Sequence, residues 1–232
     1  MSLIFNNFRG CRAVLLDFGG TLDSDGEHWL DRFYGLYDQA GINIPRPEIK
    51  AAFYQADALC HGRVTGWGLR PLMRHHVHLQ FQSLNLRSPD KERELADLFC
   101  AKSESYLRRN AQILDRIKDR YRLGVISNFY GNVAALCQEA GLDANLEVIL
   151  DSMQVGLSKP QPEIFEMALN KLQLSPDRVI FVGDSYDRDM IPARELGMKT
   201  VWLKGPNPRV PENAGPVAAQ VSSLLELEAL LP

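Results

Sequence analysis

The sequence lacks the features that mark secreted, membrane-spanning and disulfide-stabilised proteins. Only four cysteines occur among 232 residues, and no two of them form a CxxC pair. This scarcity favours buried free thiols in a reducing compartment over a disulfide or zinc framework. The first ten residues, MSLIFNNFRG, lack the long apolar core of a signal peptide, and no later apolar run reaches membrane-spanning length. We therefore expect a cytoplasmic protein.

An excess of positive charge is also missing. The formal net charge is −3, which gives no electrostatic footprint for nucleic acid or for an anionic membrane surface. No internal repeat or low-complexity tract is present. The composition, 45% hydrophobic and 24% charged, is ordinary for a globular protein. The length suits one large domain or a core domain with a smaller companion.

What the sequence does contain is a set of short apolar runs that predict strands. Each run is continuous rather than alternating, which is typical of parallel strands buried on both faces. The strands predicted in this way, the last two more weakly, are Ala13–Leu16, Leu123–Ile126, Val179–Val182, Leu146–Leu150 and Thr200–Leu203. Helical patterns follow at Gly131–Ala140, Glu163–Leu172 and Asp187–Leu196. Strand, turn and helix in this repeated order predict a doubly wound α/β fold.

One long stretch departs from this alternation. Residues 25–118 carry helical periodicity and no convincing strand, so we interpret them as an inserted helical cap domain. The α/β core domain then comprises residues 1–24 and 119–232. Within it, the proline- and glycine-rich Gly205–Gly215 predicts a surface loop, and Ser222–Leu231 predicts a short helix capped by Ser222 or Ser223.

Polar residues follow the predicted strands at the points where they end. Asp17 follows the first strand, Ser127 and Asn128 the second, and Asp184 a third, while Lys159 precedes a helix between the last two. Ligands of an open parallel sheet bind beyond the carboxyl ends of its strands. A nucleophilic carboxylate, a hydroxyl, a lysine and paired acids that hold Mg²⁺ are the groups that phosphoryl transfer requires.

These residues form four motifs that resemble those of the haloacid dehalogenase-like hydrolases. DFGGT, residues 17–21, is similar to the family's first motif, DxDGT, and Ser127 in GVISN is similar to the second. Lys159 in LSKPQPEIF matches the third, and Gly183-Asp184 through Asp189 in FVGDSYDRDM, followed by ARELGM, matches the fourth. Each motif alone is weak, but four in order over essentially the whole chain are specific. The resemblance implies a Rossmann-like core with a helical cap between the first and second motifs.

The resemblance also implies a reaction. Asp17 would attack phosphorus and form an aspartyl-phosphate, while Ser127 and Lys159 would bind the phosphate. Mg²⁺ would be the cofactor, and its ligands would be Asp17, the Gly19 carbonyl, Asp184 and Asp189, the last through water or by orienting Lys159. We expect further substrate contacts from Asn128, Gly20, Thr21, Arg63 and Arg70. The expected partner is a phosphorylated small molecule, without nucleic acid or membrane, and the expected assembly is a monomer or homodimer.

Gly19 is the departure from the family's phosphatases, which carry at this position an Asp that protonates the leaving oxygen and activates water. General acid–base help is worth about 10²–10⁴-fold in rate, or roughly 3–5 kcal/mol. An alkyl phosphate would lose most of this help, whereas an acyl or aryl phosphate would lose much less. Two alternatives therefore stay open. One is a catalytically weak or silent phosphate-binding or regulatory protein. The other is a 2-haloacid dehalogenase, in which the aspartate attacks carbon without a metal and against which the acids of GDSYDRD argue.

Several other residues allow two interpretations. Asp23 or Asp25 can substitute for the missing acid, although acids after such a turn are more often solvated or capping. The run His75-His76-Val77-His78 favours a surface or cap-packing role over a metal site. HGRVTGWGLRP, residues 61–71, fits either a loop that closes over substrate or a flexible connection between helices. Asp187 suits a helix N-terminus as well as a site.

Overall fold

The computed structural model describes residues 5–212 and 214–231. Its centre is a six-stranded sheet in the order β3-β2-β1-β4-β5-β6, with every neighbouring pair parallel. The strands are β1 (Ala13–Leu16), β2 (Arg122–Ser127), β3 (Val148–Asp151), β4 (Val179–Gly183), β5 (Lys199–Leu203) and β6 (Ala219–Val221). The five predicted strands and the doubly wound fold are confirmed. β6 is an additional short edge strand.

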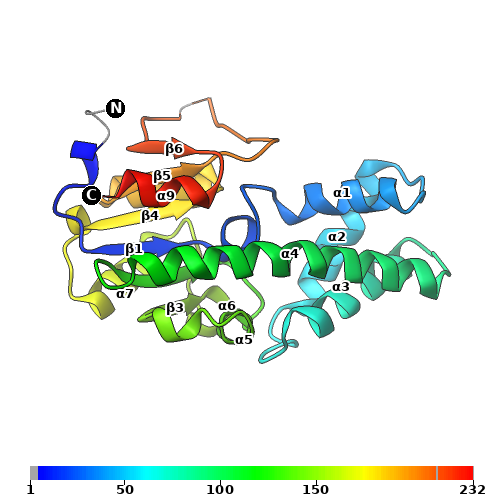
Figure 1. Ribbon diagram of the computed structural model, residues 1–232. Helices are drawn as coiled ribbons and strands as arrows, with labels where there is room; N and C mark the ends of the chain where they lie inside the picture. The colour runs from blue at the N-terminus through cyan, green and yellow to red at the C-terminus, as the bar shows by residue number, and fades with distance from the viewer. Residues whose placement is uncertain (1–4, 213, 232) are drawn as a thin grey trace.

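Helices cover both faces of this sheet (Figure 1), which explains the continuous apolar runs. Alternate residues of β1 point to opposite faces. Val14 and Leu16 belong to the apolar cluster that includes the end of α4 and α5, and Ala13 and Leu15 belong to the cluster that includes α7. The helices that follow the core strands are α5 (Val133–Glu139), α6 (Ser152–Val155), α7 (Pro162–Leu172), α8 (Ile191–Glu195) and α9 (Leu227–Leu230).

Short helical turns complete the core region. They are Phe5–Phe8, Phe18–Leu22, Asp143–Asn145, Pro176–Arg178, Tyr186–Met190 and Leu224–Glu226. The predicted helix Asp187–Leu196 is therefore divided into a wide turn and α8. The predicted C-terminal helix is likewise divided into a turn and α9, and Ser223 caps it through a capping box with Glu226. The described residues of Gly205–Gly215 form neither helix nor strand, as expected for a loop.

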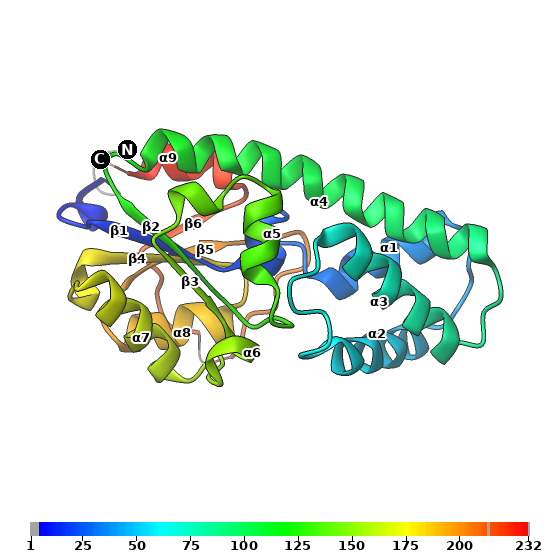
Figure 2. The same cartoon turned by 90° about the horizontal axis from the view of Figure 1, so that it is seen from below.

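Four helices form the region between β1 and β2, and none of residues 25–118 lies in a strand. They are α1 (Trp29–Gln39), α2 (Arg46–Cys60), α3 (Leu69–Ser83) and α4 (Pro89–Ile117). Figure 2 shows that α4 runs without a break from this helical cap across the sheet. Its N-terminal part packs on α3, while near its C-terminal end Arg116 pairs with Glu228 of α9 at 2.7 Å. α4 therefore joins the cap to the core.

Two further predictions concern the state of the cysteines and the presence of membrane-spanning helices. All four cysteines are buried free thiols, as expected. Burial raises the pKa of Cys60, Cys100 and Cys137 to about 12. Across residues 5–212 and 214–231, no helix is both long enough and apolar enough to cross a bilayer.

Candidate active site

The topology of the sheet brings three carboxylates together at one edge. The chain winds outward from β1 to β3 and then returns to β4, so the strand order reverses between β1 and β4. Asp17 follows β1 and Asp184 follows β4, while Asp189 lies in the turn after Asp184. One carboxylate oxygen from each of the three residues lies within 4.8 Å of the other two. We call these three residues the acid cluster, and it occupies the switch point at which open α/β sheets bind ligands.

A buried lysine and a serine contact the acid cluster. Lys159 Nζ lies 2.8 Å from Asp17 Oδ1 and 2.6 Å from Asp189 Oδ1. Ser127 Oγ, at the end of β2, donates to Asp17 Oδ1 at 2.8 Å. Asn128 fixes the backbone of Lys159 from both sides, since its Oδ1 accepts from Lys159 N and its Nδ2 donates to Lys159 O. Four of the predicted site residues thus act as one connected group with Asp189.

The glycine turn after β1 makes room for Asp184. Gly20 has a φ of +88°, and a Cβ at this position would lie only 2.6 Å from Asp184 Oδ2. A side chain is therefore excluded by both backbone conformation and space. The neighbouring Thr21 is fully buried, and its hydroxyl donates to Asp184 Oδ1 at 3.3 Å. Gly20 and Thr21, which we predicted to contact substrate, lie against Asp184 of the acid cluster.

The charges of this group do not balance. Three carboxylates share one ammonium group, and Asp189 and Lys159 are almost completely buried. Burial, reinforced by Asp17 and Asp189, raises the pKa of Asp184 well above its usual value. Burial also raises the pKa of Asp189 to about 6, despite the opposing effect of Lys159. For Lys159, burial lowers the pKa, but Asp17 and Asp189 outweigh it, and the net pKa is raised. The site therefore favours an additional cation.

The donor set suits a hard divalent cation. All candidate ligands are oxygens, and carboxylates are the protein ligands that Mg²⁺ prefers. Asp184 is a better direct ligand than Asp189, because no other described residue donates a hydrogen bond to its Oδ2. Both oxygens of Asp189 accept hydrogen bonds, one from Lys159 Nζ and one from Ser185 N. This arrangement favours an indirect role for Asp189.

Aromatic side chains lie beside Gly19, where a side chain would otherwise project. A Cβ on Gly19 would lie 3.4 Å from the Phe129 ring and 3.7 Å from Trp29 Nε1. The φ of −73° and ψ of 121° are accessible to any residue. The place of the missing acid is therefore apolar and tight, but it is not closed to a side chain.

The acid cluster opens into a cavity of about 340 Å³ between the core and the cap. Seven predicted site residues line it: Asp17, Gly19, Ser127, Asn128, Lys159, Asp184 and Asp189. Arg63 and Arg70 are not among its lining residues within the described chain. Arg70 is instead paired on the cap surface, with Glu104 at 2.8 Å and Asp97 at 3.4 Å. The structure thus assembles the motif residues and does not bring the two cap arginines to them.

Sequence reasoning missed most of the cap-side lining. His28 and Trp29 come from the start of α1, and Phe53 and Asp57 from α2. Phe129 and Tyr130 follow β2, and Arg188 lies in the turn Tyr186–Met190. One local signal was available, because Phe129 and Tyr130 directly follow the Ser127-Asn128 motif. The α2 residues carry no such signal, since they face the site only through the packing of the cap.

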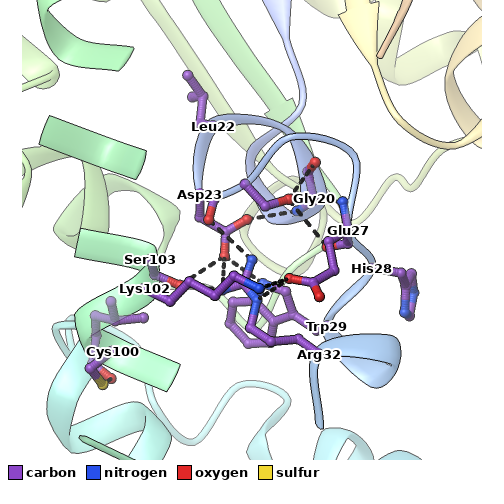
Figure 3. A network of polar contacts seen from close by, with 12 residues as sticks. Gly20, Leu22, Asp23, Glu27, His28, Trp29, Arg32, Cys100, Lys102 and Ser103 are labelled. Carbon is purple, nitrogen blue, oxygen red and sulfur yellow. Dashed lines mark hydrogen bonds and ion pairs between the residues drawn. The ribbon is translucent and has the colours of Figure 1, made fainter. Parts of the chain in front are cut away.

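Asp23 is committed to a buried network rather than to the cavity (Figure 3). Its carboxylate accepts hydrogen bonds from Gly20 N at 2.7 Å, Trp29 Nε1 at 2.6 Å and Ser103 Oγ at 3.3 Å. Arg32 lies 3.5 Å away and completes what we call the flap network. Burial raises the pKa of Asp23, although all four partners oppose the shift. This carboxylate ties the glycine turn to α1 and α4.

Asp25 is also engaged elsewhere. Both of its carboxylate oxygens pair with Arg109 of α4, at 2.7 and 2.9 Å, and one also accepts from Leu224 N. Neither Asp23 nor Asp25 lines the cavity. The structure therefore places neither acid where it can substitute for the carboxylate absent at Gly19.

The histidines of α3 have packing and surface roles, as expected. His76 is fully buried and stacks on Phe33, with ring centroids 5.6 Å apart. His78 pairs on the surface with Glu92 at 3.0 Å. Among the described residues, the acid cluster is the one group of three His, Cys, Asp or Glu side chains spaced to hold a metal.

The loop before α3 is docked on the core. Gly62 N donates to Tyr130 O, Asn132 Nδ2 donates to Trp67 O, and Leu69 N donates to a Glu139 carboxylate oxygen. Of its polar residues, His61 lines the cavity. These contacts favour a loop that covers the site over a free connection between helices. Asp187, by contrast, is exposed and outside the lining.

Comparison with known proteins agrees with this geometry. The family profile of haloacid dehalogenase-like hydrolases matches residues 11–197. The chain is 27% identical over 231 residues to the pyrimidine 5'-nucleotidase YjjG of Escherichia coli, covering 98% of this chain and 92% of that protein. It is 31% identical over 133 residues to a phosphoserine phosphatase of Thermus thermophilus, covering 54% of this chain and 52% of that protein. A crystal structure of a dehalogenase with an intermediate complex has the same fold, with a TM-score of 0.64 and 20% identity over 96% of this chain and 97% of the other.

Proposed function

Because this chain belongs to the haloacid dehalogenase-like hydrolases, we propose that it is a Mg²⁺-dependent phosphatase of small molecules that favours aryl and acyl phosphates over alkyl phosphates. The observation that carries the proposal is the acid cluster, in contact with Lys159 and Ser127 at the switch point of the sheet. The similarity to a nucleotidase and to a phosphoserine phosphatase supports phosphate esters as the substrate class.

Asp17 is the nucleophile in this proposal. Its Oδ1 accepts from Ser127 and Lys159, which leaves Oδ2 to attack phosphorus. The new bond joins Oδ2 to phosphorus, and the bond to the leaving oxygen breaks, with the electron pair departing on that oxygen. Water then attacks the aspartyl-phosphate, releasing phosphate and restoring Asp17. Ser127 and Lys159 donate to the phosphoryl oxygens.

Mg²⁺ would be held by Asp17, Asp184 and the Gly19 carbonyl, with Asp189 behind them, and would offset the charge of the phosphoryl group. Asp189 positions Lys159 through the 2.6 Å contact. Lys159 in turn places its ammonium group 2.8 Å from Asp17 Oδ1, beside the nucleophile. Asp184 is assigned to the metal and Asp189 to Lys159 because both oxygens of Asp189 already accept hydrogen bonds.

The preference for activated esters follows from the surroundings of Gly19. Phe129 and Trp29 border the place of the absent acid, and neither carries an acidic proton that it can give to an alkoxide. Aryl and acyl leaving groups depart without a proton. A metal-independent 2-haloacid dehalogenase is the weaker candidate, because it gives no role to a buried excess of carboxylates. The other alternative is a catalytically silent phosphate-binding protein, and activity measurements distinguish it from the enzyme.

The test is a screen with Mg²⁺ against acetyl phosphate, 4-nitrophenyl phosphate and glucose 6-phosphate. We expect the first two to be hydrolysed faster than the third, and Asp17→Asn to lose at least about 10⁴-fold in kcat. Asp38→Asn, on the exposed face of α1, is the matched control and should behave as wild type. Equal, negligible rates for wild type and Asp17→Asn on all three compounds would refute the proposed phosphatase activity and favour a silent phosphate-binding protein.

Placing an acid at position 19 tests whether its absence sets the preference for activated esters. Gly19→Asp places a Cβ 3.4 Å from the Phe129 ring, at the lower limit of ordinary van der Waals contact. We expect it to raise glucose 6-phosphate turnover relative to acetyl phosphate turnover by about tenfold or more, the low end of general acid catalysis. An unchanged ratio would show that the missing proton donor does not set the substrate preference.

A further inference from the structure

A chain of buried polar groups crosses the cap and ends at the cavity. Tyr37 OH donates to Gln80 Oε1 at 3.2 Å, and Gln80 Nε2 lies 2.9 Å from His76 Nδ1. His76 Nε2 lies 3.0 Å from Asp57 Oδ1. Tyr130 OH, from the core loop after β2, also donates to Asp57 Oδ1. Tyr37, Gln80 and His76 are fully buried, so the chain costs desolvation and must be satisfied internally.

The direction of each hydrogen bond in this chain is fixed. Gln80 Oε1 accepts from Tyr37, so Gln80 Nε2 is the donor to His76 Nδ1. In neutral His76 the proton is then on Nε2, which donates to Asp57. Asp57 Oδ1 therefore receives two hydrogen bonds, from His76 and Tyr130, and the carboxylate is held in one orientation.

The other oxygen of Asp57 remains available. No donor of the described residues is hydrogen-bonded to Oδ2, and the Asp57 side chain is 21% exposed where it lines the cavity. A carboxylate oxygen without a donor, at the wall of the cavity, is an acceptor that selects ligands carrying a hydrogen-bond donor.

Aromatic rings surround the same part of the cavity. Trp29, Phe53, Tyr54, Phe129 and Tyr130 line it together with Asp57. Trp29 and Phe129 pack edge to face at 5.2 Å, and Phe129 and Tyr130 lie 4.8 Å apart. Aromatic walls of this kind favour a planar ring, which they contact by stacking or edge-to-face packing.

We propose that this cap-side subsite binds the organic part of the substrate as a planar ring that bears an O–H or N–H donor directed at Asp57 Oδ2. The inference rests on the proposed function for the phosphate end, since the acid cluster and Asp57 line one cavity. The substrate class is then an aryl phosphate with a donor on the ring, small enough for about 340 Å³. Asp57 acts here as a specificity determinant and takes no part in bond breaking.

The probes are 4-hydroxyphenyl phosphate and 4-methoxyphenyl phosphate, which differ in the donor and have similar ring electronics. Binding is measured by calorimetry with Mg²⁺ in the Asp17→Asn protein, so that neither compound is consumed. We expect the hydroxy compound to bind at least about fivefold more tightly, because an acceptor left unpaired by the methoxy compound is costly. Adding Asp57→Asn should reduce this ratio to below about twofold, since an amide N–H then replaces the acceptor.

Two further variants separate recognition from a structural role. Asp38→Asn, on the exposed face of α1, should leave the ratio unchanged. Tyr130→Phe removes the hydrogen bond from the Tyr130 hydroxyl to Asp57 Oδ1 but leaves Oδ2 in place, so the hydroxy compound should still be preferred. If Asp57 serves only to tie the cap to the core, Asp57→Asn will weaken both compounds equally and keep their ratio. That result, or the absence of any preference or binding in the Asp17→Asn protein, overturns the inference. Turnover of 4-nitrophenyl phosphate by wild type tests the proposed function separately.

Discussion

The acid cluster and the flap network are two buried groups of charged residues that begin only six residues apart in the sequence, at Asp17 and Asp23. In the flap network, one carboxylate faces Arg32 and three hydrogen-bond donors. In the acid cluster, three carboxylates share one charged partner, Lys159, and their other donors are the neutral Ser127 hydroxyl, Thr21 hydroxyl and Ser185 N–H. The flap network is complete without a ligand, whereas the acid cluster has an excess of negative charge.

The causes of the pKa shifts show the same contrast. Burial raises the pKa of Asp23, and its main charged partner, Arg32, opposes the shift. Burial also raises the pKa of Asp184, but Asp17 and Asp189 add to the shift and only Lys159 opposes it among charged groups. The partners of Asp23 thus favour its charged form, while the carboxylates beside Asp184 disfavour its charged form. The difference is consistent with the proposal that Asp184 holds Mg²⁺ and that Asp23 stabilises the fold.

The largest expected effect comes from breaking the flap network. Asp23→Ala leaves the buried Arg32 guanidinium without this carboxylate and removes the acceptor of three hydrogen-bond donors, so we expect the free energy of unfolding to fall by about 3–5 kcal/mol. Urea unfolding in EDTA measures this change. Asp38→Ala on the exposed face of α1 should stay within about 0.5 kcal/mol of wild type. A loss no larger than that of the control would mean that the network does not stabilise the fold.

The opposite result is expected when an acid is removed from the acid cluster. Asp184→Asn relieves repulsion, so the metal-free protein should be as stable as wild type or up to about 1 kcal/mol more stable. Mg²⁺ at 100 times its Kd should stabilise wild type by about 2.7 kcal/mol and should stabilise this variant much less. Urea unfolding with Mg²⁺ and with EDTA compares the two. Equal stabilisation by Mg²⁺ in both proteins would show that Asp184 is not a ligand.

The sequence was sufficient for the sheet and for the motif residues. Continuous apolar runs identified five strands, because both faces of this sheet are covered. Asp17 and Asp184 were predicted to meet because parallel strands end at the same edge. Strand β6 escaped prediction since Ala219–Val221 is a three-residue edge strand, too short for a pattern.

The cap side of the site was not predictable in the same way. Arg63 and Arg70 attracted attention by their charge, yet Arg70 pairs with acids of α4 that no sequence pattern connects to it. Asp57 gave no signal, because a lone acid on a helix is usually solvated. Its role depends on His76 and Tyr130, which come from α3 and from a core loop. Contacts between distant elements decide the cap-side lining, and local patterns do not encode them.

The smallest expected effect is the contribution of Asp23, in the flap network, to the pH dependence of the free energy of unfolding. The pKa of Asp23 in the folded protein is raised above its ordinary value of 3.8, so between these two values the folded chain binds more protons than the unfolded chain. The free energy of unfolding therefore falls as the pH rises through this window. Asp23→Asn cannot titrate, so its stability should fall less steeply from pH 4 upward, while Asp184 and Asp189 contribute equally to both proteins. Urea unfolding in EDTA at intervals between pH 4 and pH 7 measures the difference, which grows by about 1.4 kcal/mol for every pH unit that the window spans. Parallel curves for the two proteins would mean that the four partners of Asp23 fully offset its burial.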